Sequence, residues 1–595
     1  MRGLPDEGTR KNRKLTARLR ACTCYALEPA CNSCPPAVDM SAAVIHTAIT
    51  SHRADWCRFS PIARDGTSLH ASLIAWGPRR VRQAKVRLDR SFTIGRADRR
   101  LFGAFVEHLG RGVYDGIYEP GHPAANERGF RCDVLDLVKE LGPTIIKYPG
   151  GNFVSTYRWE DGVGPVEERP KRLSYAWQST EPNTFGTNEF IDWCRLANVE
   201  PMLVVNLATR GPQDSGNFVE YCNHPGGTTL SDLRRAHGWD KPHGVKFWCL
   251  GNEMDGPLHT GVDTPEEYGR LAAQAAKIMR WADHAIEIAA SGSSARHLPT
   301  FGYWDETVLK HAFDHVDSIA LHTYLNNWKD DALAFLASVD LVDAFIEEMV
   351  AIADAAAAKR RSAKRIMLSF NEWNVWYRTR RPYQTRMQPG WPVAPPLLEE
   401  VYSVEDALVV GGFLISLLNH ADRVRSACLA QLVNVIAPIM TEAGGPAWRQ
   451  TIFHPFALMS RFARGDVVTT SVECETYAAA YYCPHGAEDT SYPVPRAAYL
   501  KLSAVANEGG GLTLFGLNRD VEQEMSVLVN ARGFGRLAVA EATVLTDSDL
   551  KATNSKAAPD RVKPAKLSGV AVGSETVRIE LPPASWSVIR LTAAP

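Results

Sequence analysis

The order of apolar and polar positions divides the chain into parts of different character. From about Arg87 onward, short continuous apolar runs alternate with longer segments in which apolar residues recur every three or four positions. Continuous runs of strand length are typical of parallel strands that are buried on both faces. Eight such runs stand out, at residues 101–106, 144–148, 201–206, 245–250, 286–291, 318–322, 366–370 and 427–432.

Helical patterns lie between these runs. An apolar stripe between residues 130 and 141 predicts one helix, which Gly142 and Pro143 end. Residues 264–267 (Thr-Pro-Glu-Glu) form a capping box with proline at the first helical position, which predicts a helix towards Ala282. Further helices are predicted at residues 345–363 and 448–462.

Eight strands that alternate with helices over about 360 residues predict an α/β fold of the (β/α)8 TIM barrel type with insertions. An open, doubly wound sheet is the alternative that alternation alone leaves open. No G-x-G-x-x-G motif opens a helix after the first strand, so that alternative lacks its usual support.

The pattern changes again after about Asp466, where short β-branched or alternating segments are separated by glycine, proline and aspartate. This pattern is typical of an all-β sandwich, here jelly-roll-like, and the strand-like segment 85–94 is positioned to complete it. The segments lie at residues 467–474, 477–482, 497–504, 512–517, 524–529, 537–545, 576–581 and 585–591. The expected domains are a disordered extension (1–83), strands joining the sandwich (84–100), the barrel (101–465) and the sandwich (466–595).

Composition is that of an ordinary globular protein, with 45% hydrophobic and 22% charged residues in a chain of 595. The net charge of −1 gives no reason to expect a nucleic acid or an acidic membrane as partner. No run approaches the ~18–20 apolar residues of a membrane span, and no apolar stretch follows the basic N-terminus as in a secretory signal. Five cysteines fall within predicted elements and are expected to be buried thiols of a reducing, cytoplasmic protein: Cys132, Cys194, Cys222, Cys249 and Cys428.

Four further cysteines, Cys22, Cys24, Cys31 and Cys34, have a spacing that admits a zinc site. The surrounding segment argues against such a site, because it is rich in proline, lacks periodic apolar positions and is not followed by a second cysteine pair. A disordered extension, or a start codon assigned too early, is the favoured interpretation of this region.

Polar side chains follow almost every predicted barrel strand. Because the carboxyl ends of barrel strands form the active face, these side chains are expected to meet there. They are Glu107 and His108, residues 148–152, Asn206, Asn252 and Glu253, residues 291–294, His322 and Tyr324, residues 372–374, and Gln431 with Asn434. Structural caps alone would not be expected to recur at eight successive strands.

Two glutamates in this set point to glycoside cleavage. Glu253 follows the fourth strand and Glu372 ends the seventh, each beside an asparagine and in aromatic surroundings, where a solvated surface glutamate is not expected. A pair of carboxyl groups across one cavity supplies an acid for the leaving oxygen and a nucleophile for the anomeric carbon. No H-E-x-x-H motif or histidine pair backed by aspartates accompanies them, so neither a metal nor a cofactor is expected.

Around these residues the chain resembles the α-L-arabinofuranosidases of glycoside hydrolase family 51, from about Lys85 to the C-terminus. The segments that carry the resemblance are GAFVEHLGRGVYDGIYEPGHP (103–123), KYPGGNFVSTYRWEDGVGP (147–165), FWCLGNEMDGP (247–257), LHTY (321–324), LSFNEWNVWY (368–377) and LAQLVNVIAPIMTE (429–442). The resemblance implies an enzyme that removes terminal α-L-arabinofuranosyl residues from arabinose-containing oligosaccharides, without a cofactor and as a homo-oligomer, commonly a hexamer.

The resemblance also implies roles for particular residues. It assigns Glu253 as the general acid/base and Glu372 as the nucleophile of a retaining double displacement. It assigns sugar binding to Glu107, Asn152, Asn252, His322, Tyr324 and Gln431. Asn252 is expected to donate to the 2-hydroxyl, Tyr324 to orient the nucleophile and His322 to support the acid/base. Trp159 and Trp177 are expected to offer stacking surfaces.

The chain departs from the family pattern at two places. Leu258, followed by His259, replaces a common tryptophan in a loop that borders the leaving group, which leaves the leaving-group preference open. Asn371 replaces a common aspartate before the nucleophile. Another retaining specificity, such as a β-xylosidase or an endoglucanase, and a non-catalytic carbohydrate-binding protein are the alternatives. Both catalytic glutamates are present, which disfavours the second.

Overall fold

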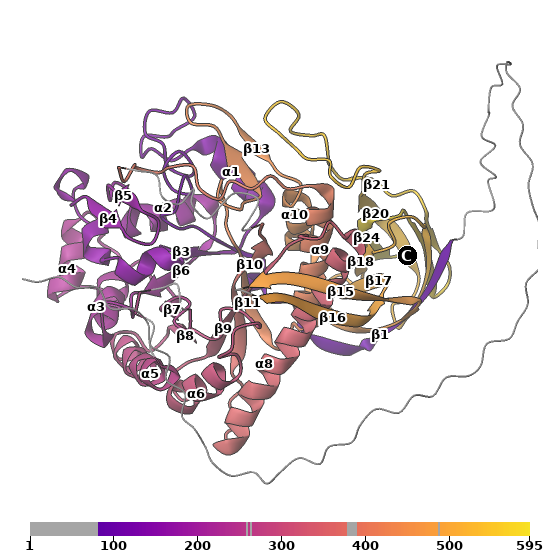
Figure 1. Cartoon of the computed structure of the whole chain (residues 1–595), viewed down its shortest axis with the longest axis horizontal. Helices are drawn as coiled ribbons and strands as arrows, with labels where there is room; N and C mark the ends of the chain where they lie inside the picture. The colour runs from indigo at the N-terminus through magenta and orange to yellow at the C-terminus, as the bar shows by residue number, and fades with distance from the viewer. Residues whose placement is uncertain (1–80, 257–259, 262–263, 378–389, 486–487, 595) are drawn as a thin grey trace, which may run out of the picture. The chain divides into compact units, whose positions relative to one another are not determined.

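The computed structural model describes residues 81–256, 260–261, 264–377, 390–485 and 488–594 (Figure 1). The four cysteines of the possible zinc site and nearly all of the expected extension lie outside the described residues, as do Leu258 and His259. No helix in the described part of the chain is both long enough and apolar enough to cross a membrane.

The central feature is a closed barrel of eight parallel strands, in the order β10-β11-β2-β3-β6-β7-β8-β9. All eight apolar runs identified in the sequence contribute a strand, which confirms the (β/α)8 prediction over the open sheet. The strands are β2 (Gly103–Phe105), β3 (Ile145–Tyr148), β6 (Glu200–Val205), β7 (Phe247–Leu250), β8 (Glu287–Ala290), β9 (Ser318–Leu325), β10 (Met367–Val375) and β11 (Val424–Leu429).

Helices surround the barrel (Figure 1). They are α1 (Cys132–Leu141), α2 (Thr187–Ala197), α3 (Pro212–Asn223), α4 (Thr229–Ala236), α5 (Pro265–Ala282), α6 (Tyr303–Ala312), α7 (Ala332–Ala337), α8 (Val339–Lys359), α9 (Val404–Asn419) and α10 (Phe453–Phe462). The predicted ends of α1 and α5 are confirmed. Gly142 ends α1 in the left-handed conformation, at φ 72°, and the Thr264 hydroxyl caps α5 by accepting from the Glu267 N–H.

Two helix predictions need correction. Helix α8 begins at Val339, before the predicted residue 345. The segment 448–462 is not one helix, because Ala447–Arg449 forms β13 and pairs with β12 (Ile439–Thr441), so that α10 begins only at Phe453. Gly444 at φ 66° lies in the turn between these strands. Strand β13 has only three residues, which are too few to be distinguished in the sequence from the helix that follows.

The C-terminal part is a sheet of ten strands in the order β21-β20-β24-β18-β17-β14-β1-β19-β23-β22. Strand β1 (Arg82–Arg96) lies between β14 (Gly465–Cys474) and β19 (Met525–Arg532), antiparallel to the first and parallel to the second. The remaining strands are β17 (Leu500–Asn507), β18 (Leu512–Asn518), β20 (Leu537–Leu545), β21 (Ala565–Lys566), β22 (Val570–Val572), β23 (Thr576–Leu581) and β24 (Ser585–Ala593). Alternate side chains of β1, β18, β19 and β23 are buried in one apolar cluster, so the sheet folds around a core of its own.

A separate hairpin, β15 (Thr476–His485) with β16 (Glu488–Ala498), links this part to the barrel. The Tyr481 hydroxyl accepts from the Asn326 N–H at 2.9 Å, and the Tyr477 hydroxyl donates to the Leu333 carbonyl at 3.0 Å. The sequence pattern places one strand at 497–504, whereas the structure divides this region between β16 and β17. Which residues of β15 and β16 pair with each other depends on long-range contacts. The alternation of apolar and polar residues within one segment does not predict this pairing.

Helix α9 lies between the barrel and the ten-stranded sheet (Figure 1) and is buried along almost its whole length. This burial explains its nearly uniform apolar sequence, since a helix that contacts other elements on all sides has no polar face. Gly411 on α9 allows the Trp586 indole of β24 to approach, because a Cβ at this position would lie 2.4 Å from the ring. The helix therefore fastens the two parts of the molecule together through close packing.

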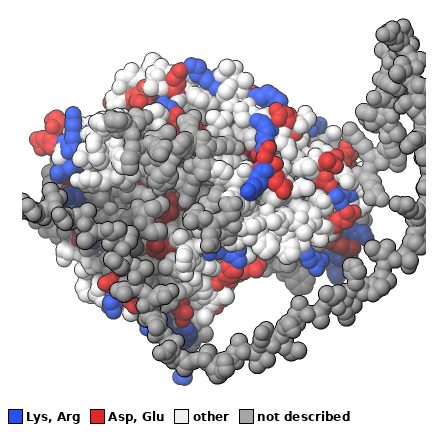
Figure 2. All heavy atoms as spheres, in the orientation of Figure 1, with Lys and Arg blue, Asp and Glu red and all other residues white. Residues whose placement is uncertain are grey.

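Charged residues are distributed over the surface in agreement with the small net charge. On the face drawn in Figure 2, Lys and Arg side chains are interspersed with Asp and Glu side chains among the described residues. This face has no large area of a single sign in the part of the chain that the structure describes.

Candidate active site

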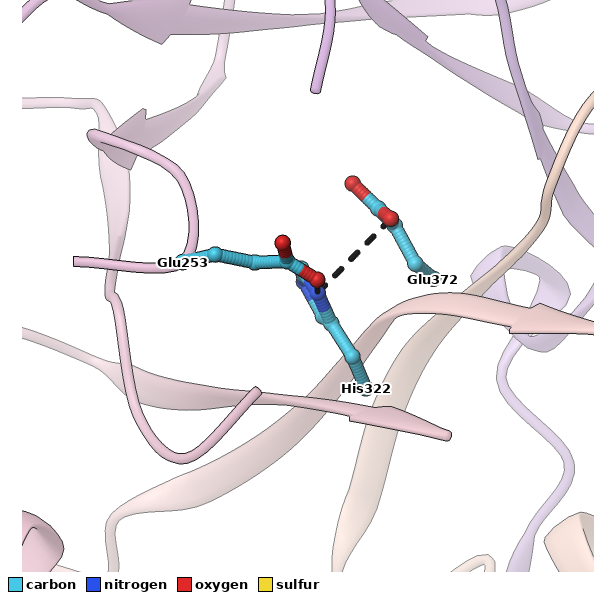
Figure 3. A group of neighbouring side chains, drawn as sticks. All are labelled: Glu253, His322 and Glu372. Atoms are coloured by element: carbon cyan, nitrogen blue, oxygen red, sulfur yellow. Dashed lines mark hydrogen bonds and ion pairs between the residues drawn. The ribbon is translucent and has the colours of Figure 1, made fainter. Parts of the chain in front are cut away.

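The two glutamates identified in the sequence face each other at the carboxyl end of the barrel (Figure 3). His322 on β9 lies between them, with its Nδ1 atom 2.9 Å from Glu253 Oε1 and 3.7 Å from Glu372 Oε2. One carboxylate oxygen from each glutamate and the histidine nitrogen all lie within 4.8 Å of one another. The two carboxyl groups therefore face the same small volume.

The backbone around Glu253 is shaped to direct its side chain into this volume. Strand β7 ends at Leu250, Gly251 follows at φ 77°, and Glu253 itself has φ 45°. A left-handed conformation is unfavourable for a residue with a Cβ and is retained where the surrounding structure holds it, often at functional sites. By contrast, Glu372 lies within strand β10, where it pairs with His322 of β9 directly after an irregularity in the ladder between Ser369 and Glu372.

Glu372 is buried and has a specific partner for each carboxylate oxygen. The Tyr324 hydroxyl donates to Oε2 at 2.7 Å, and the Lys147 ammonium donates to Oε1 at 2.9 Å. Donors on both oxygens stabilise the ionised form of a carboxylate in a site with little water. The arrangement suits a group that must act as an anion.

Lys147 was not identified as a site residue in the sequence, and it has a central place here. Its side chain is fully buried, and its ammonium also donates to Asn252 Oδ1 at 2.8 Å. Burial is the largest single influence and lowers the pKa of this ammonium. The charge and hydrogen bond of Glu372, with smaller contributions from Cys249 and Cys428, together outweigh burial and raise the pKa above its ordinary value. A lysine within the apolar run of β3 was the signal available in the sequence, since a buried lysine needs a partner.

Glu107 marks a second region of the site. Its Oε1 accepts from the Phe153 N–H and from the Trp177 indole N–H, each at 2.9 Å, and its Oε2 accepts from Gln431 Nε2 at 3.0 Å. Burial and, to a smaller extent, the charge of Glu372 raise the pKa of Glu107 to about 7, against the lowering effects of the Phe153 and Trp177 N–H groups and of Lys147. Glu107 is thus a carboxyl group that changes its charge near neutral pH.

Two buried polar atoms in the site have no hydrogen-bond partner among the described residues. They are Nδ2 of Asn252 and Oε1 of Gln431, and both side chains use their other polar atom within the site. A buried unpaired donor and a buried unpaired acceptor are costly unless a ligand completes them. Asn152, which begins the short helix η2 (Asn152–Thr156), is half-buried. Sugar hydroxyl groups have the chemistry that these unpaired atoms require.

Asp255 is a further carboxyl group close to the acid/base candidate. Its Oδ2 accepts from the Ser294 N–H at 2.9 Å, and the side chain is 6% exposed. Burial raises the pKa of Asp255 to about 6, the Ser294 N–H opposes this shift, and the charge of Glu253 adds to it. Asp255 could not be singled out from the sequence, because its partner Ser294 lies 39 positions away along the chain.

Several strand-end residues of the predicted set have structural roles. Asn206 donates to the Tyr157 carbonyl at 2.9 Å and accepts from two backbone N–H groups of its own loop. Asn434 donates to the Arg111 carbonyl and to the Thr441 hydroxyl. His108 bonds to Glu181 at 2.8 Å and to Tyr148 at 2.7 Å. Polar caps of this kind fix the loops and are not all part of the chemistry.

Two tryptophans expected to offer stacking surfaces do not do so. Trp159 is 4% exposed and stacks on Phe218 inside the protein, with ring centres 5.1 Å apart. Trp177 is 5% exposed and donates its indole N–H to Glu107.

Asn371, which departs from the family pattern, is also buried. Its amide N–H donates to Cys249 Sγ at 3.4 Å, and its amide oxygen accepts from the Ser369 hydroxyl. Cys132, expected to be buried, is exposed at the start of α1, whereas the other four cysteines of that group are buried.

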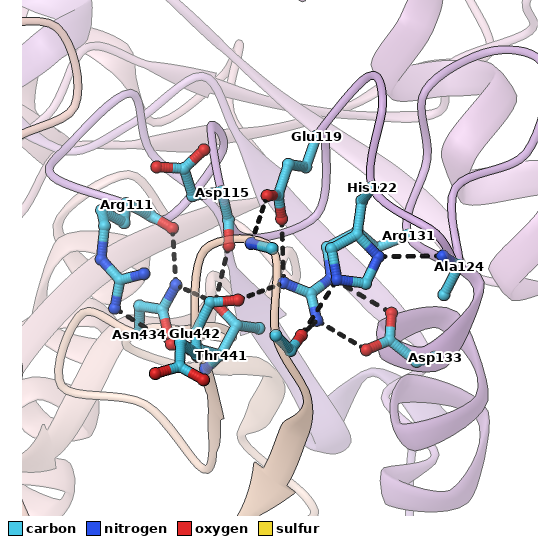
Figure 4. Close-up of polar contacts among 12 residues, drawn as sticks. Arg111, Asp115, Glu119, His122, Ala124, Arg131, Asp133, Asn434, Thr441 and Glu442 are labelled. Atoms are coloured by element: carbon cyan, nitrogen blue, oxygen red, sulfur yellow. Dashed lines mark hydrogen bonds and ion pairs between the residues drawn. The ribbon is translucent and has the colours of Figure 1, made fainter.

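A polar network holds the loop that follows Gln431 against the loop that follows Glu107 (Figure 4). Its centre is Arg131, whose fully buried guanidinium pairs with Glu119 at 3.0 Å and with Asp133 at 2.6 Å. The same guanidinium donates to the backbone carbonyls of Glu442 and Gly445. The network thereby fixes the relative positions of two loops that each carry a site residue.

Glu253, His322 and Glu372 are also close enough together to hold a metal ion. The Lys147 ammonium already lies on Glu372, and a second cation beside it would be repelled. The donor set therefore fits proton transfer better than metal binding.

Comparison with known proteins gives a consistent result. Residues 137–334 match the family model described as the alpha-L-arabinofuranosidase 1 domain, and residues 371–585 match the alpha-L-arabinofuranosidase C-terminal domain. The chain is 49% identical over 504 residues to an intracellular exo-alpha-(1->5)-L-arabinofuranosidase of Halalkalibacterium halodurans, covering 85% of this chain and 98% of that one. It is 47% identical over 524 residues to an exo-alpha-(1->6)-L-arabinofuranosidase of Bifidobacterium longum, covering 86% and 98%. A solved family 51 alpha-L-arabinofuranosidase from Bifidobacterium longum superposes with a TM-score of 0.79 at 41% identity, covering 86% of this chain and all of that one.

Proposed function

The chain belongs to the α-L-arabinofuranosidases of glycoside hydrolase family 51, and from this membership we propose how its own residues carry out the reaction. It is an exo-acting glycosidase that removes terminal α-L-arabinofuranosyl residues. Two relatives of nearly equal identity are named for different linkages, (1->5) and (1->6). The proposal therefore includes the exo-acting removal of arabinofuranosyl residues that both names share, and it includes no linkage.

The proposed mechanism is a retaining double displacement. Glu253 protonates the glycosidic oxygen while Glu372 attacks the anomeric carbon, which breaks the bond to the leaving sugar and forms a covalent arabinofuranosyl ester. Glu253, now a carboxylate, then takes a proton from water, whose oxygen displaces Glu372 from the anomeric carbon. The two inversions leave the configuration of the sugar unchanged.

One observation carries this proposal, the closeness of the two carboxyl groups. Oxygens of Glu253 and Glu372 lie within 4.8 Å of each other. Retaining enzymes have carboxyl groups about 5–5.5 Å apart, whereas inverting enzymes need about 6.5–9.5 Å to admit a water molecule. The short separation favours direct attack by Glu372.

The surrounding side chains support both glutamates. Tyr324 and Lys147 stabilise the anionic nucleophile through its two oxygens. The His322 Nδ1 atom is within hydrogen-bond distance of Glu253 Oε1. Depending on the tautomer of the ring, this nitrogen donates to the Glu253 carboxylate or accepts from the Glu253 carboxylic acid. His322 can therefore support Glu253 in both protonation states of the catalytic cycle. No metal or cofactor takes part in the proposed steps.

The arabinofuranose is proposed to be held by the remaining site residues. The unpaired Asn252 amide donates to the 2-hydroxyl, and the unpaired Gln431 oxygen accepts from another ring hydroxyl. Glu107 and Asn152 bind the other hydroxyl groups. Because Lys147 holds the oxygen of the Asn252 amide, the N–H side of that amide is directed to the sugar.

Azide rescue with 4-nitrophenyl α-L-arabinofuranoside tests the two roles. A Glu372→Ala protein should be inactive, and azide should convert it to a producer of the inverted β-azide. A Glu253→Ala protein should still form the ester from this activated substrate, and azide should then yield the retained α-azide. Undiminished activity of Glu372→Ala would disprove the mechanism, and a faster reaction with a β-xyloside would point to the alternative specificity.

We also propose a homo-oligomer, a hexamer by resemblance, which light scattering of the purified protein would test. A cytoplasmic location is proposed because the Halalkalibacterium relative is named intracellular.

A further inference from the structure

Two adjoining hollows on the active face lie beside the proposed sugar site, and we call them together the β4 groove. Thr156, Arg158 and Tyr175 line both hollows, Lys171 and Arg172 line one, and Arg210 lines the other. The hollows have volumes of about 390 Å³ and 500 Å³. All six residues belong to loops that follow the carboxyl ends of β3 and β6, where a barrel enzyme meets its substrate.

The groove begins directly at the site. Helix η2 (Asn152–Thr156) starts with a proposed sugar contact, Asn152, and ends with a residue of the groove wall, Thr156. Phe153 lines the groove and also donates its N–H to Glu107. A chain of sugars that leaves the arabinofuranose site on this side would enter the β4 groove.

The groove presents an exposed aromatic ring. Tyr175, just after β4 (Arg172–Ser174), is 63% exposed. Its ring stands edge-on to the Trp391 ring, with centres 6.2 Å apart and an angle of 86° between the planes. A tyrosine that is held by a neighbouring ring and still exposes most of its surface is suited to stacking on a sugar.

The groove also carries excess positive charge. Arg172 pairs with Asp161, and Arg210 pairs with Glu160. Arg158 and Lys171 have no acidic partner among the described residues, and both are exposed. Two cations without partners in a hollow attract an anionic ligand, and a guanidinium matches the geometry of a carboxylate.

We propose that the β4 groove binds the part of the substrate beyond the cleaved residue and that it favours glycans bearing a uronic acid. Tyr175 stacks on a sugar ring of the leaving group, and Arg158 with Lys171 binds the carboxylate of the uronic acid. This inference rests on the proposed function, because the groove acts only on a substrate whose arabinofuranosyl end occupies the site.

Three substrates separate the elements of this inference. They are 4-nitrophenyl α-L-arabinofuranoside, a neutral arabinofuranosyl oligosaccharide, and the same oligosaccharide with one uronic acid residue. The double variant Arg158→Gln/Lys171→Gln should raise KM about fivefold for the uronate substrate alone, because ion pairs of exposed cations contribute modestly to binding. The effect should shrink at high salt, since exposed charges are screened.

The Tyr175→Ala variant should raise KM about threefold or more for both oligosaccharides and leave the nitrophenyl substrate unchanged. A double variant of exposed cations on β1, Lys85→Gln/Arg87→Gln, removes the same charge from the distant sheet and should change nothing.

The results also separate failure of this inference from failure of the proposed function. Equal effects of Arg158→Gln/Lys171→Gln on the neutral and the acidic oligosaccharide, or no effect on either, would overturn the uronate preference. Unchanged KM values for Tyr175→Ala would overturn the groove as a binding site. A wild-type protein that does not cleave the nitrophenyl arabinofuranoside would instead contradict the function itself.

Discussion

The Lys147 ammonium lies 2.9 Å from Glu372 Oε1, and the two residues come from strands β3 and β10 on different sides of the barrel interior. The pair is buried, with side-chain exposures of 0% and 7%. A buried charge without its partner is strongly unfavourable, so each residue stabilises the ionised form of the other. The same ammonium orients Asn252, which makes Lys147 the link between the nucleophile and a proposed substrate contact.

Replacing Lys147 by Met should lower kcat/KM by about 10²–10³-fold, comparable to the loss of one preorganised electrostatic contact. The loss should fall mainly on kcat, because the ammonium holds the carboxylate that must attack in the chemical step. The charge-preserving Lys147→Arg variant should retain more activity than Lys147→Met. If both variants lose activity equally, Lys147 acts only through packing.

The barrel was predictable from sequence because its strands are continuous apolar runs. The strand ends also identified four side chains that the structure brings together, Glu253, His322, Tyr324 and Glu372. Lys147 was missed because its role depends on a partner 225 positions away. A pattern of apolar and polar positions reports burial but not which buried groups meet across a barrel.

The tryptophans illustrate the same limit from the other direction. Trp177 lies in a long loop whose sequence gives no sign of burial, and only the folded structure shows that its N–H is needed by Glu107. The exposed ring in this region is Tyr175, two positions earlier. In loops, which side chain turns inward depends on long-range contacts rather than on local periodicity.

Glu107 is expected to reduce stability as pH rises. Its pKa is about 7 in the folded protein against an ordinary 4.5, so the folded state binds its proton more tightly than the unfolded state. Stability from this group is therefore complete below about pH 4.5 and is lost as pH rises through 7. Glu107→Gln should raise the melting temperature at pH 8 relative to wild type and leave it nearly unchanged at pH 5.

The glutamine can fit because Gln431 has an unpaired oxygen that can turn to accept from the new amide. The surface variant Glu541→Gln serves as control, since its partner Arg590 is also exposed. The variant should bind the sugar poorly, so stability and activity should change in opposite directions. At each pH, the melting temperature of Glu107→Gln is compared with that of wild type. If this difference is less favourable to the variant at pH 8 than at pH 5, the raised pKa of Glu107 is contradicted.

Arg131 should be the most sensitive residue of the loop network. Arg131→Met leaves Glu119 and Asp133 without their cation and leaves two carbonyl groups unpaired, which should cost about 3–5 kcal/mol. Scanning calorimetry should show a clear fall in melting temperature, and KM should rise because the Gln431 loop is released. Arg449→Met, which removes a partly exposed ion pair between Arg449 of β13 and Glu140 of α1, should cost less than about 1 kcal/mol. Equal effects of the two substitutions would show that the network is not the anchor of the loop.

Gly411 offers a test of how the barrel and the sheet are held together. An added Cβ would lie 2.4 Å from the Trp586 ring, and the indole is fully buried, so α9 and β24 must separate or the ring must leave its place. Overpacking of this kind costs about 1–3 kcal/mol. Gly411→Ala should therefore shorten the half-life of activity at elevated temperature and leave kcat and KM at 25 °C nearly unchanged, because Gly411 makes no contact with the site. Gly509→Ala is the matched control, since a Cβ there meets nothing within 4 Å. If both variants inactivate at the wild-type rate, the contact between Gly411 and Trp586 does not limit stability, and the junction must be held by other contacts of α9.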